Sequence, residues 1–294
     1  MTRVERVLRP RGIYSLRLTA ASRDATRAWD DDAFTAAVRV GGGTELASAR
    51  QRADGTLVVR AASDDGVEAL RFQLALDDDH AEFLRRFGED PLLGTAVRRI
   101  AGLRQARLGS VAQALLRAFA GQLIESRRAR AIEAAIVRAA TPRVGGTRLH
   151  APPTAACLGA LAPARMRRLG LHANRGAALV RICRSYDPER LRDLPTDAAV
   201  RVLTRERGLG PWSAGVVCLE GLGRTEHGLV GDLGLMKLLA ALRGRWVEAW
   251  ETEELLAPYG EWAGLASVYL LKGWARGLLP LPSAPPPARF RHAA

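Results

Sequence analysis

A Gly-x-Gly turn followed at once by proline restricts this chain more than any other local feature. Gly208, Leu209 and Gly210 stand directly before Pro211, and the apolar spacing upstream predicts a helix that ends near Leu203. Proline suits the first turn of a helix, because its missing N–H would have no partner there. The sequence therefore predicts two helices joined by a tight hairpin.

The glycines of this hairpin allow two interpretations. Glycine adopts positive φ and lets another backbone approach closely. The N–H groups at the start of the second helix also point outward, where they can bind an anion such as a phosphodiester. The same residues are typical of an ordinary helix–helix turn with capping glycines. Taken alone, the glycines favour the ordinary turn.

The N-terminal third has the pattern of a small sheet. Residues 13–18, 33–40 and 57–60 contain the apolar/polar alternation of half-buried strands, and glycine-containing turns at 41–44 and 53–56 separate them. We therefore expect antiparallel strands in this part of the chain.

Helical spacing dominates from about residue 110 onward. Helices are predicted at 111–140, 161–183, 197–203, 212–222, 232–242 and 261–278. The 294 residues suffice for about two domains. We predict an α+β protein, with a small antiparallel-sheet domain over residues 1–105 and an all-α domain over 106–282. The Pro-rich residues 283–294 are expected to be disordered.

The charge of the chain is compatible with a polyanionic partner. The net charge is +13, and 44 residues are basic, of which only Lys237 and Lys272 are lysines. Such a balance is typical of proteins that bind nucleic acid. A bias toward arginine can also reflect genome base composition, so charge alone does not decide between the two.

The cysteines and the apolar runs exclude several classes of protein. Cys157, Cys183 and Cys218 are too widely spaced for a disulfide framework, a four-cysteine zinc site or an iron–sulfur cluster. The N-terminus lacks the apolar core of a signal peptide, and no apolar run approaches the length of a membrane span. We expect a soluble cytoplasmic protein with no membrane partner.

The stretch from residue 203 to 239 closely resembles the helix-hairpin-helix DNA glycosylase superfamily. About twenty residues after the hairpin, Gly231 and Asp232 open a new helix, as the catalytic aspartate does in that superfamily. Residues 119–126 resemble its helix with a Gly-Gln-Leu step, and residues 261–274 resemble its closing helix. With an N-terminal sheet domain, the chain is most similar to the DNA-3-methyladenine glycosylase II type.

This resemblance implies a glycosylase domain at 106–282 and a set of site residues. Asp232 would be the catalytic carboxylate, although aspartate is also a common helix N-cap. Trp212, Trp262 and Val216 would line the base pocket, with Val216 where some relatives have an aromatic residue. Trp212 occupies the position of a lysine in members that also cut the strand. The resemblance thus implies a monofunctional enzyme without lyase activity.

Other implied residues would contact the DNA. Gln122 and Leu123 match the region that fills the gap left by an extruded base, although a leucine at this spacing is often a core residue. Gly208, Leu209 and Gly210 would bind a phosphate. Backbone carbonyls of Thr204, Glu206 and Leu209 would hold a Na⁺ or K⁺ ion. No organic cofactor is implied.

The resemblance also implies the reaction and the partner. The chain would hydrolyse the N-glycosidic bond of alkylated purines such as 3-methyladenine in double-stranded DNA, the first step of base excision repair. It would act as a monomer, associated with the nucleoid in a bacterium. Three alternatives stay open: another lesion, such as uracil, hypoxanthine or ethenoadenine; a non-catalytic helix-hairpin-helix module; or a basic scaffold for acidic partners.

Overall fold

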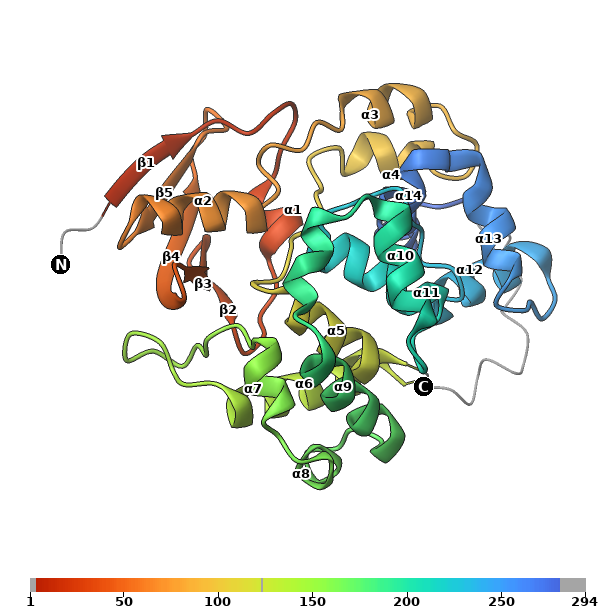
Figure 1. Cartoon of the computed structure of the whole chain (residues 1–294). Coiled ribbons are helices and arrows are strands. Elements are labelled where there is room, and N and C mark those ends of the chain that lie inside the picture. Colours follow the sequence, from red (N-terminus) through yellow and green to blue (C-terminus); the bar gives the residue numbers. More distant parts are fainter. Residues whose placement is uncertain (1–3, 123, 281–294) are drawn as a thin grey trace.

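A five-stranded antiparallel sheet begins the fold in the computed structural model, which describes residues 4–122 and 124–280 (Figure 1). The strands are β1 (Val4–Leu8), β2 (Arg27–Asp30), β3 (Ala33–Val40), β4 (Gly43–Gln51) and β5 (Leu57–Ala61). Their order in the sheet is β1-β5-β4-β3-β2, and all neighbours are antiparallel. The strands predicted at 33–40 and 57–60 are confirmed.

One helix covers the sheet. Ser63 accepts a hydrogen bond from the Gly66 amide and caps α2 (Asp64–Gln73). Val67 and Leu70 of this helix are buried with Phe34 of β3 and other apolar residues of the sheet. The N-terminal unit thus has its own small core, with the helix on one face of the sheet (Figure 1).

The predicted strand at 13–18 is wrong. Residues 16–20 form a short helix, α1 (Leu16–Ala20), because the Ser15 side chain accepts a hydrogen bond from the Leu18 amide and caps its first turn. The apolar Leu16 is buried against the sheet. Alternation over so few residues did not distinguish a strand from a capped helical turn.

Helices form the rest of the described chain. They are α3 (Ala81–Phe87), α4 (Gly94–Arg99), α5 (Val111–Gly121), α6 (Ser126–Ala140), α7 (Ala155–Gly159), α8 (Pro163–Arg168), α9 (Ala173–Ser185), α10 (Thr196–Arg205), α11 (Pro211–Val216), α12 (Leu233–Arg243), α13 (Glu251–Leu256) and α14 (Ala263–Trp274). Two short 3₁₀ segments (Pro188–Asp193 and Ala257–Trp262) and a π-helical segment, η2 (Val217–Leu222), lie among them.

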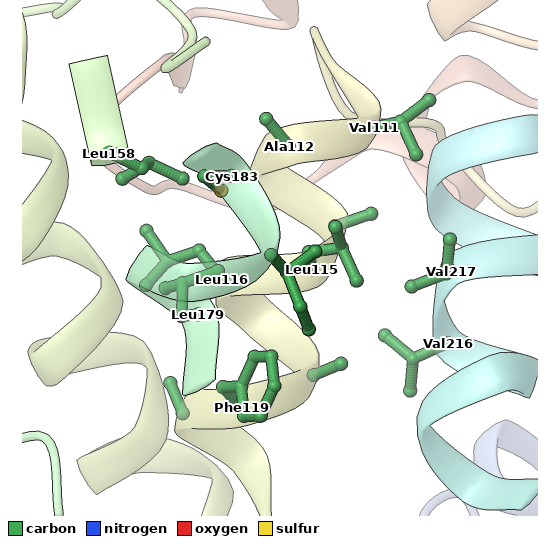
Figure 2. Packing of buried hydrophobic residues seen from close by; sticks show 14 of the residues in the cluster. Val111, Ala112, Leu115, Leu116, Phe119, Leu158, Leu179, Cys183, Val216 and Val217 are labelled. Atoms are coloured by element: carbon green, nitrogen blue, oxygen red, sulfur yellow. The ribbon is translucent and has the colours of Figure 1, made fainter. Parts of the chain in front are cut away.

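These helices enclose two hydrophobic cores. The first core packs α5 through α11 together; Leu115, Phe119 and Leu179 lie in it. Figure 2 shows Val216 and Val217 directed at Leu115 in this core. The predicted helix 111–140 is in fact two helices, α5 and α6, and the break between them contains Gln122.

The second core joins α3 and α4 to α12, α13 and α14. Phe83 and Val97 of the earlier helices are buried with Leu235 and Tyr269 of the later ones. Residues 81–99 thus pack with the C-terminal helices, although the sequence predicted a single N-terminal domain over 1–105. The predicted tail, 283–294, lies outside the described residues.

A buried cluster of charges ties the N-terminal unit to the helices. Arg117 of α5 pairs with Asp24 at 3.2 Å, with Glu133 of α6 at 2.8 Å and with Glu220 of η2. Burial opposes ionisation of Asp24, but the charges of Arg27 and Arg117 outweigh it and lower its pKa to about 2. Arg117 therefore stays charged at the centre of three acidic partners.

Within the described residues, no helix is both long and apolar enough to cross a bilayer.

Candidate active site

The predicted hairpin joins α10 to α11. The Leu209 amide donates to the Glu206 carbonyl at 3.0 Å, which closes a turn that contains Gly208. Gly208 has φ +97°, a conformation that residues with a Cβ rarely adopt. Leu209 is buried in the first core, while both glycines are exposed. The hairpin is thus anchored by one leucine and presents its glycine backbone to solvent.

Asp232 caps α12, as its residue type favours. Its Oδ1 accepts hydrogen bonds from the amides of Gly234 at 2.8 Å and Leu235 at 3.2 Å. These bonds fix the carboxylate at the N-terminal end of α12, the positive end of the helix dipole. The capping and catalytic interpretations are compatible, because the cap uses only one of the two oxygens.

The second oxygen of Asp232 contacts Trp212. The indole Nε1–H of Trp212 donates to Asp232 Oδ2 at 2.8 Å. Both side chains are half-buried, so the carboxylate is reachable from solvent. No ion pair involves Asp232 in residues 4–122 and 124–280. The result is an oriented carboxylate beside an indole ring and next to the hairpin.

The last residue of α5 makes room for that ring. A Cβ placed on Gly121 would lie 2.7 Å from Cη2 of Trp212, closer than side chains approach one another. Only glycine at this position lets the indole lie against the helix end. Gly121 belongs to the Gly-Gln-Leu step of the sequence, but its role as a support for Trp212 was not predicted.

Gln122 is tied to the hairpin. Its Nε2 donates to the Gly208 carbonyl at 2.6 Å and to Ser213 Oγ at 3.1 Å. Its own carbonyl accepts from Arg175 Nη1 at 2.6 Å. The side chain predicted to enter DNA is thus engaged within the protein, and its role as a wedge stays a prediction. Leu123, the other predicted wedge residue, lies outside the described residues.

Two predicted pocket residues lie in packed surroundings. Val216 is buried in the first core, where it faces Leu115 (Figure 2). The Trp262 ring packs against His80 and Phe83, with ring centres 6.2 and 5.8 Å away. Neither contact is to the Trp212–Asp232 pair, and a pocket role for either residue stays a prediction.

Helix α14 instead brings a leucine close to the start of α12. A Cβ placed on Gly234 would lie 2.6 Å from Cδ2 of Leu271, so this side chain packs against the turn that Asp232 caps. Leu271 is nine residues beyond Trp262 on the same stretch. Sequence reasoning missed it because an aliphatic residue on an apolar helix carries no functional signal.

The backbone predicted to hold a monovalent cation is partly free to do so. The Glu206 carbonyl accepts the hydrogen bond of the turn. In the described part of the chain, the carbonyls of Thr204 and Leu209 accept no hydrogen bond. Carbonyl oxygens are suitable ligands for hard cations. No group of three or more His, Cys, Asp or Glu side chains among the described residues is arranged to hold a metal.

Comparisons with known proteins agree with the fold. No family model matches the chain. A DNA-3-methyladenine glycosylase of Bacillus subtilis is 25% identical over 204 residues, which cover 66% of this chain and 67% of the relative.

Solved structures resemble the chain over most of its length. A 3-methyladenine DNA glycosylase from Archaeoglobus fulgidus matches with a TM-score of 0.80 and 21% identity, covering 94% of this chain and 99% of that one. An 8-oxoguanine glycosylase/lyase from Clostridium acetobutylicum, in complex with double-stranded DNA, has a TM-score of 0.74 and 16% identity, with 90% and 92% covered. The chain therefore has the fold of the helix-hairpin-helix DNA glycosylases, and it resembles that superfamily in sequence.

Proposed function

We propose that this chain is a DNA glycosylase that hydrolyses the N-glycosidic bond of alkylated purines in double-stranded DNA, acting as a monomer. The observation that carries the proposal is the half-exposed carboxylate of Asp232, oriented by the cap of α12 and by Trp212 beside the hairpin. The relatives named 3-methyladenine glycosylases support the substrate class.

The carboxylate has a direct part in this reaction. As the base departs, positive charge develops on the deoxyribose, and a carboxylate held near C1′ stabilises that charge. Asp232 also accepts a hydrogen bond from the water that attacks the sugar. Because the cap and Trp212 fix both oxygens, Asp232 needs little rearrangement to act.

A positively charged base explains why one carboxylate suffices. An alkylated purine such as 3-methyladenine leaves without a strong acid to protonate it, and it gains cation–π attraction over an indole face, worth roughly 0.5–2 kcal/mol. Trp212 supplies such a face next to Asp232. We assign Trp212 two tasks, stacking on the base and holding the carboxylate.

The target base reaches Asp232 only when it leaves the duplex. Extrusion costs a few kcal/mol of stacking and pairing. Phosphate contacts at Gly208 and Gly210 hold the strand, and we propose, from the resemblance, that Gln122 and Leu123 fill the space left in the duplex. We propose that a Na⁺ or K⁺ ion held by the carbonyls of Thr204, Glu206 and Leu209 adds positive charge beside that phosphate.

We propose that strand cleavage is absent. Trp212 carries no amine that could form a Schiff base with the sugar, and it occupies the position of the lysine in lyase members. Reduction with borohydride during turnover should trap no covalent DNA adduct, and abasic strands should break only on alkali treatment. A borohydride-stable adduct would contradict this part of the proposal.

The decisive experiment compares the wild type with Asp232→Asn on duplexes that contain 3-methyladenine, 8-oxoguanine, uracil, hypoxanthine or ethenoadenine. Released base is measured under single-turnover conditions, and binding to an abasic-site analogue is measured in parallel. We expect release of the alkylated purine by the wild type, none by the variant, and similar binding by both. Release of a different base would reject the substrate class, and a fully active variant would reject the role of Asp232.

A further inference from the structure

A cavity of about 430 Å³ adjoins the hairpin on the side of α9. Asn174, Arg175 and Arg181 of α9 line one wall, Arg207 and Gly208 of the hairpin line the other, and Phe119 lies at its floor. None of these α9 residues or Arg207 has a part in the proposed chemistry at Asp232. The cavity shares Arg207 and Gly208 with the hairpin and is otherwise separate from it.

Positive charge is in excess around this α9 cavity. Arg181 pairs with Glu206 at 2.8 Å, and its side chain is half exposed. Arg207 is exposed, and in residues 4–122 and 124–280 neither it nor Arg175 forms an ion pair with an acidic side chain. Three guanidinium groups therefore face one carboxylate, and their donors suit phosphate oxygens.

The wall at Arg175 is held in place before any ligand arrives. One of its nitrogens donates to the Gln122 carbonyl, and the Gln122 side chain donates to the Gly208 carbonyl. This chain of hydrogen bonds links α9 to the hairpin across the rim of the cavity. Preorganised donors lose less conformational entropy when they bind.

A nucleobase would fit this cavity less well than a phosphate. Phe119 is fully buried in the first core, so it presents no exposed ring face for stacking. The groups within reach are guanidinium donors and the Asn174 amide. Phosphates follow one another every 3.4 Å or so of duplex axis on each strand. A strand held at Gly208 thus passes the cavity mouth within about one or two nucleotides.

We propose that the α9 cavity binds a second backbone phosphate of the DNA strand that the hairpin holds. This inference rests on the proposed function for its ligand, since it takes DNA as the partner. It extends the contact with DNA beyond the hairpin, and it assigns Arg181 and Arg207 as the phosphate ligands.

The test measures affinity for an undamaged duplex over a series of salt concentrations. Arg181→Ala and Arg207→Ala should each reduce the slope of log affinity against log salt, by up to about 1, because each removes one of the two guanidinium ligands of the same phosphate. Arg207→Lys retains the charge and should keep most of the slope. Glu206→Gln should have the opposite effect, with tighter binding and a steeper slope, because it frees Arg181 from its partner.

Arg99→Ala is the matched control. Arg99 is an exposed arginine on α4, a helix that packs in the second core and does not line the cavity. It should change the slope less than either cavity variant. Melting temperatures of all variants should match the wild type, which separates lost contacts from lost folding. Equal slopes for wild type, Arg181→Ala and Arg207→Ala would overturn the proposal.

Two further outcomes separate this inference from its alternatives. If inorganic phosphate at matched ionic strength saturates the wild type but not Arg207→Ala, while duplex binding is equal in both, the cavity is a site for a free anion and the proposal fails. Because undamaged DNA is used, a wild type that releases no base still reports on the cavity. Failure of the proposed function and failure of this inference are therefore distinguishable.

Discussion

Trp212 Nε1 donates a hydrogen bond of 2.8 Å to Asp232 Oδ2, and this bond joins two residues that lie twenty positions apart in the chain. The indole comes from the helix that follows the hairpin, and the carboxylate from the helix that packs in the second core. The bond therefore sets the direction of the carboxylate oxygen that the cap of α12 leaves unused.

Replacing Trp212 by phenylalanine separates its two proposed tasks. Trp212→Phe keeps an aromatic face but removes the donor to Asp232, and hydrogen bonds to charged groups contribute about 1.5–3 kcal/mol. We expect the rate of base release to fall roughly 10- to 100-fold, with little change in binding to an abasic-site analogue. Single-turnover kinetics measure the rate. Trp212→Ala, which loses both tasks, should be slower still, and equal rates for Phe and wild type would show that the bond is dispensable.

Gly121→Ala should disturb the same pair from the opposite side. The added methyl group would lie 2.7 Å from the Trp212 ring, so the indole must move and its bond to Asp232 must lengthen. We expect slower base release and a change in tryptophan fluorescence. Gly146→Ala is a control for substitution alone, since no atom lies within 4 Å of the position of its Cβ, although its positive φ adds local strain. Unchanged release by Gly121→Ala would mean that the ring tolerates displacement.

Arg117 should be essential for stability. Arg117→Met leaves Asp24, Glu133 and Glu220 buried or half-buried without their common partner, and breaking a buried ion pair in this way costs about 3–5 kcal/mol. Urea unfolding measures the loss. The deficit should increase from acidic to neutral pH, because unpartnered carboxylates must ionise as the pH rises. Arg138→Met, at an exposed position of α6, should have little effect. A deficit that does not vary with pH would indicate lost packing alone.

His80 should make stability fall in mild acid. Burial, and then the charges of Arg104 and Arg107, lower its pKa from 6.5 to about 3. The unfolded chain binds a proton below pH 6.5 that the folded chain does not accept until pH 3, so unfolding becomes easier across that interval. At pH 5 this amounts to about 2 kcal/mol.

Thermal unfolding of His80→Gln checks this linkage. The variant should lose stability less steeply than the wild type between pH 7 and pH 5, whereas His172→Gln, at an exposed histidine, should follow the wild type. Parallel curves for His80→Gln and wild type would show that His80 is not the group that titrates.

Local patterns in the sequence were enough to predict the hairpin, the helix that Asp232 caps and two of the five strands, β3 and β5. Turn glycines, caps and periodicity act over a few residues, and they determine local structure wherever packing agrees. The α1 helix was missed because a single serine cap outweighed the alternation around it. The strand at 33–40 was found because part of it alternates and a glycine-rich turn follows it directly.

Such local patterns do not predict contacts between residues that are distant in the sequence. Nothing local indicates that Gly121 lies against Trp212, or that Gln122 bonds the hairpin carbonyl. In the C-terminal stretch, the resemblance pointed to Trp262, just before α14, whereas the structure places Leu271 of α14 against the start of α12. The face of a helix that contacts the site depends on how the whole helix packs, and residue type alone does not predict it.

Trp212 packs against the first core, whereas Asp232 caps a helix of the second core. A change in how the two cores pack against each other would therefore change the geometry of the Trp212–Asp232 hydrogen bond. Substitutions in the second core, many residues from Asp232, would then slow base release although every site residue is unchanged. The packing between the two cores thus determines how Trp212 and Asp232 are aligned with each other.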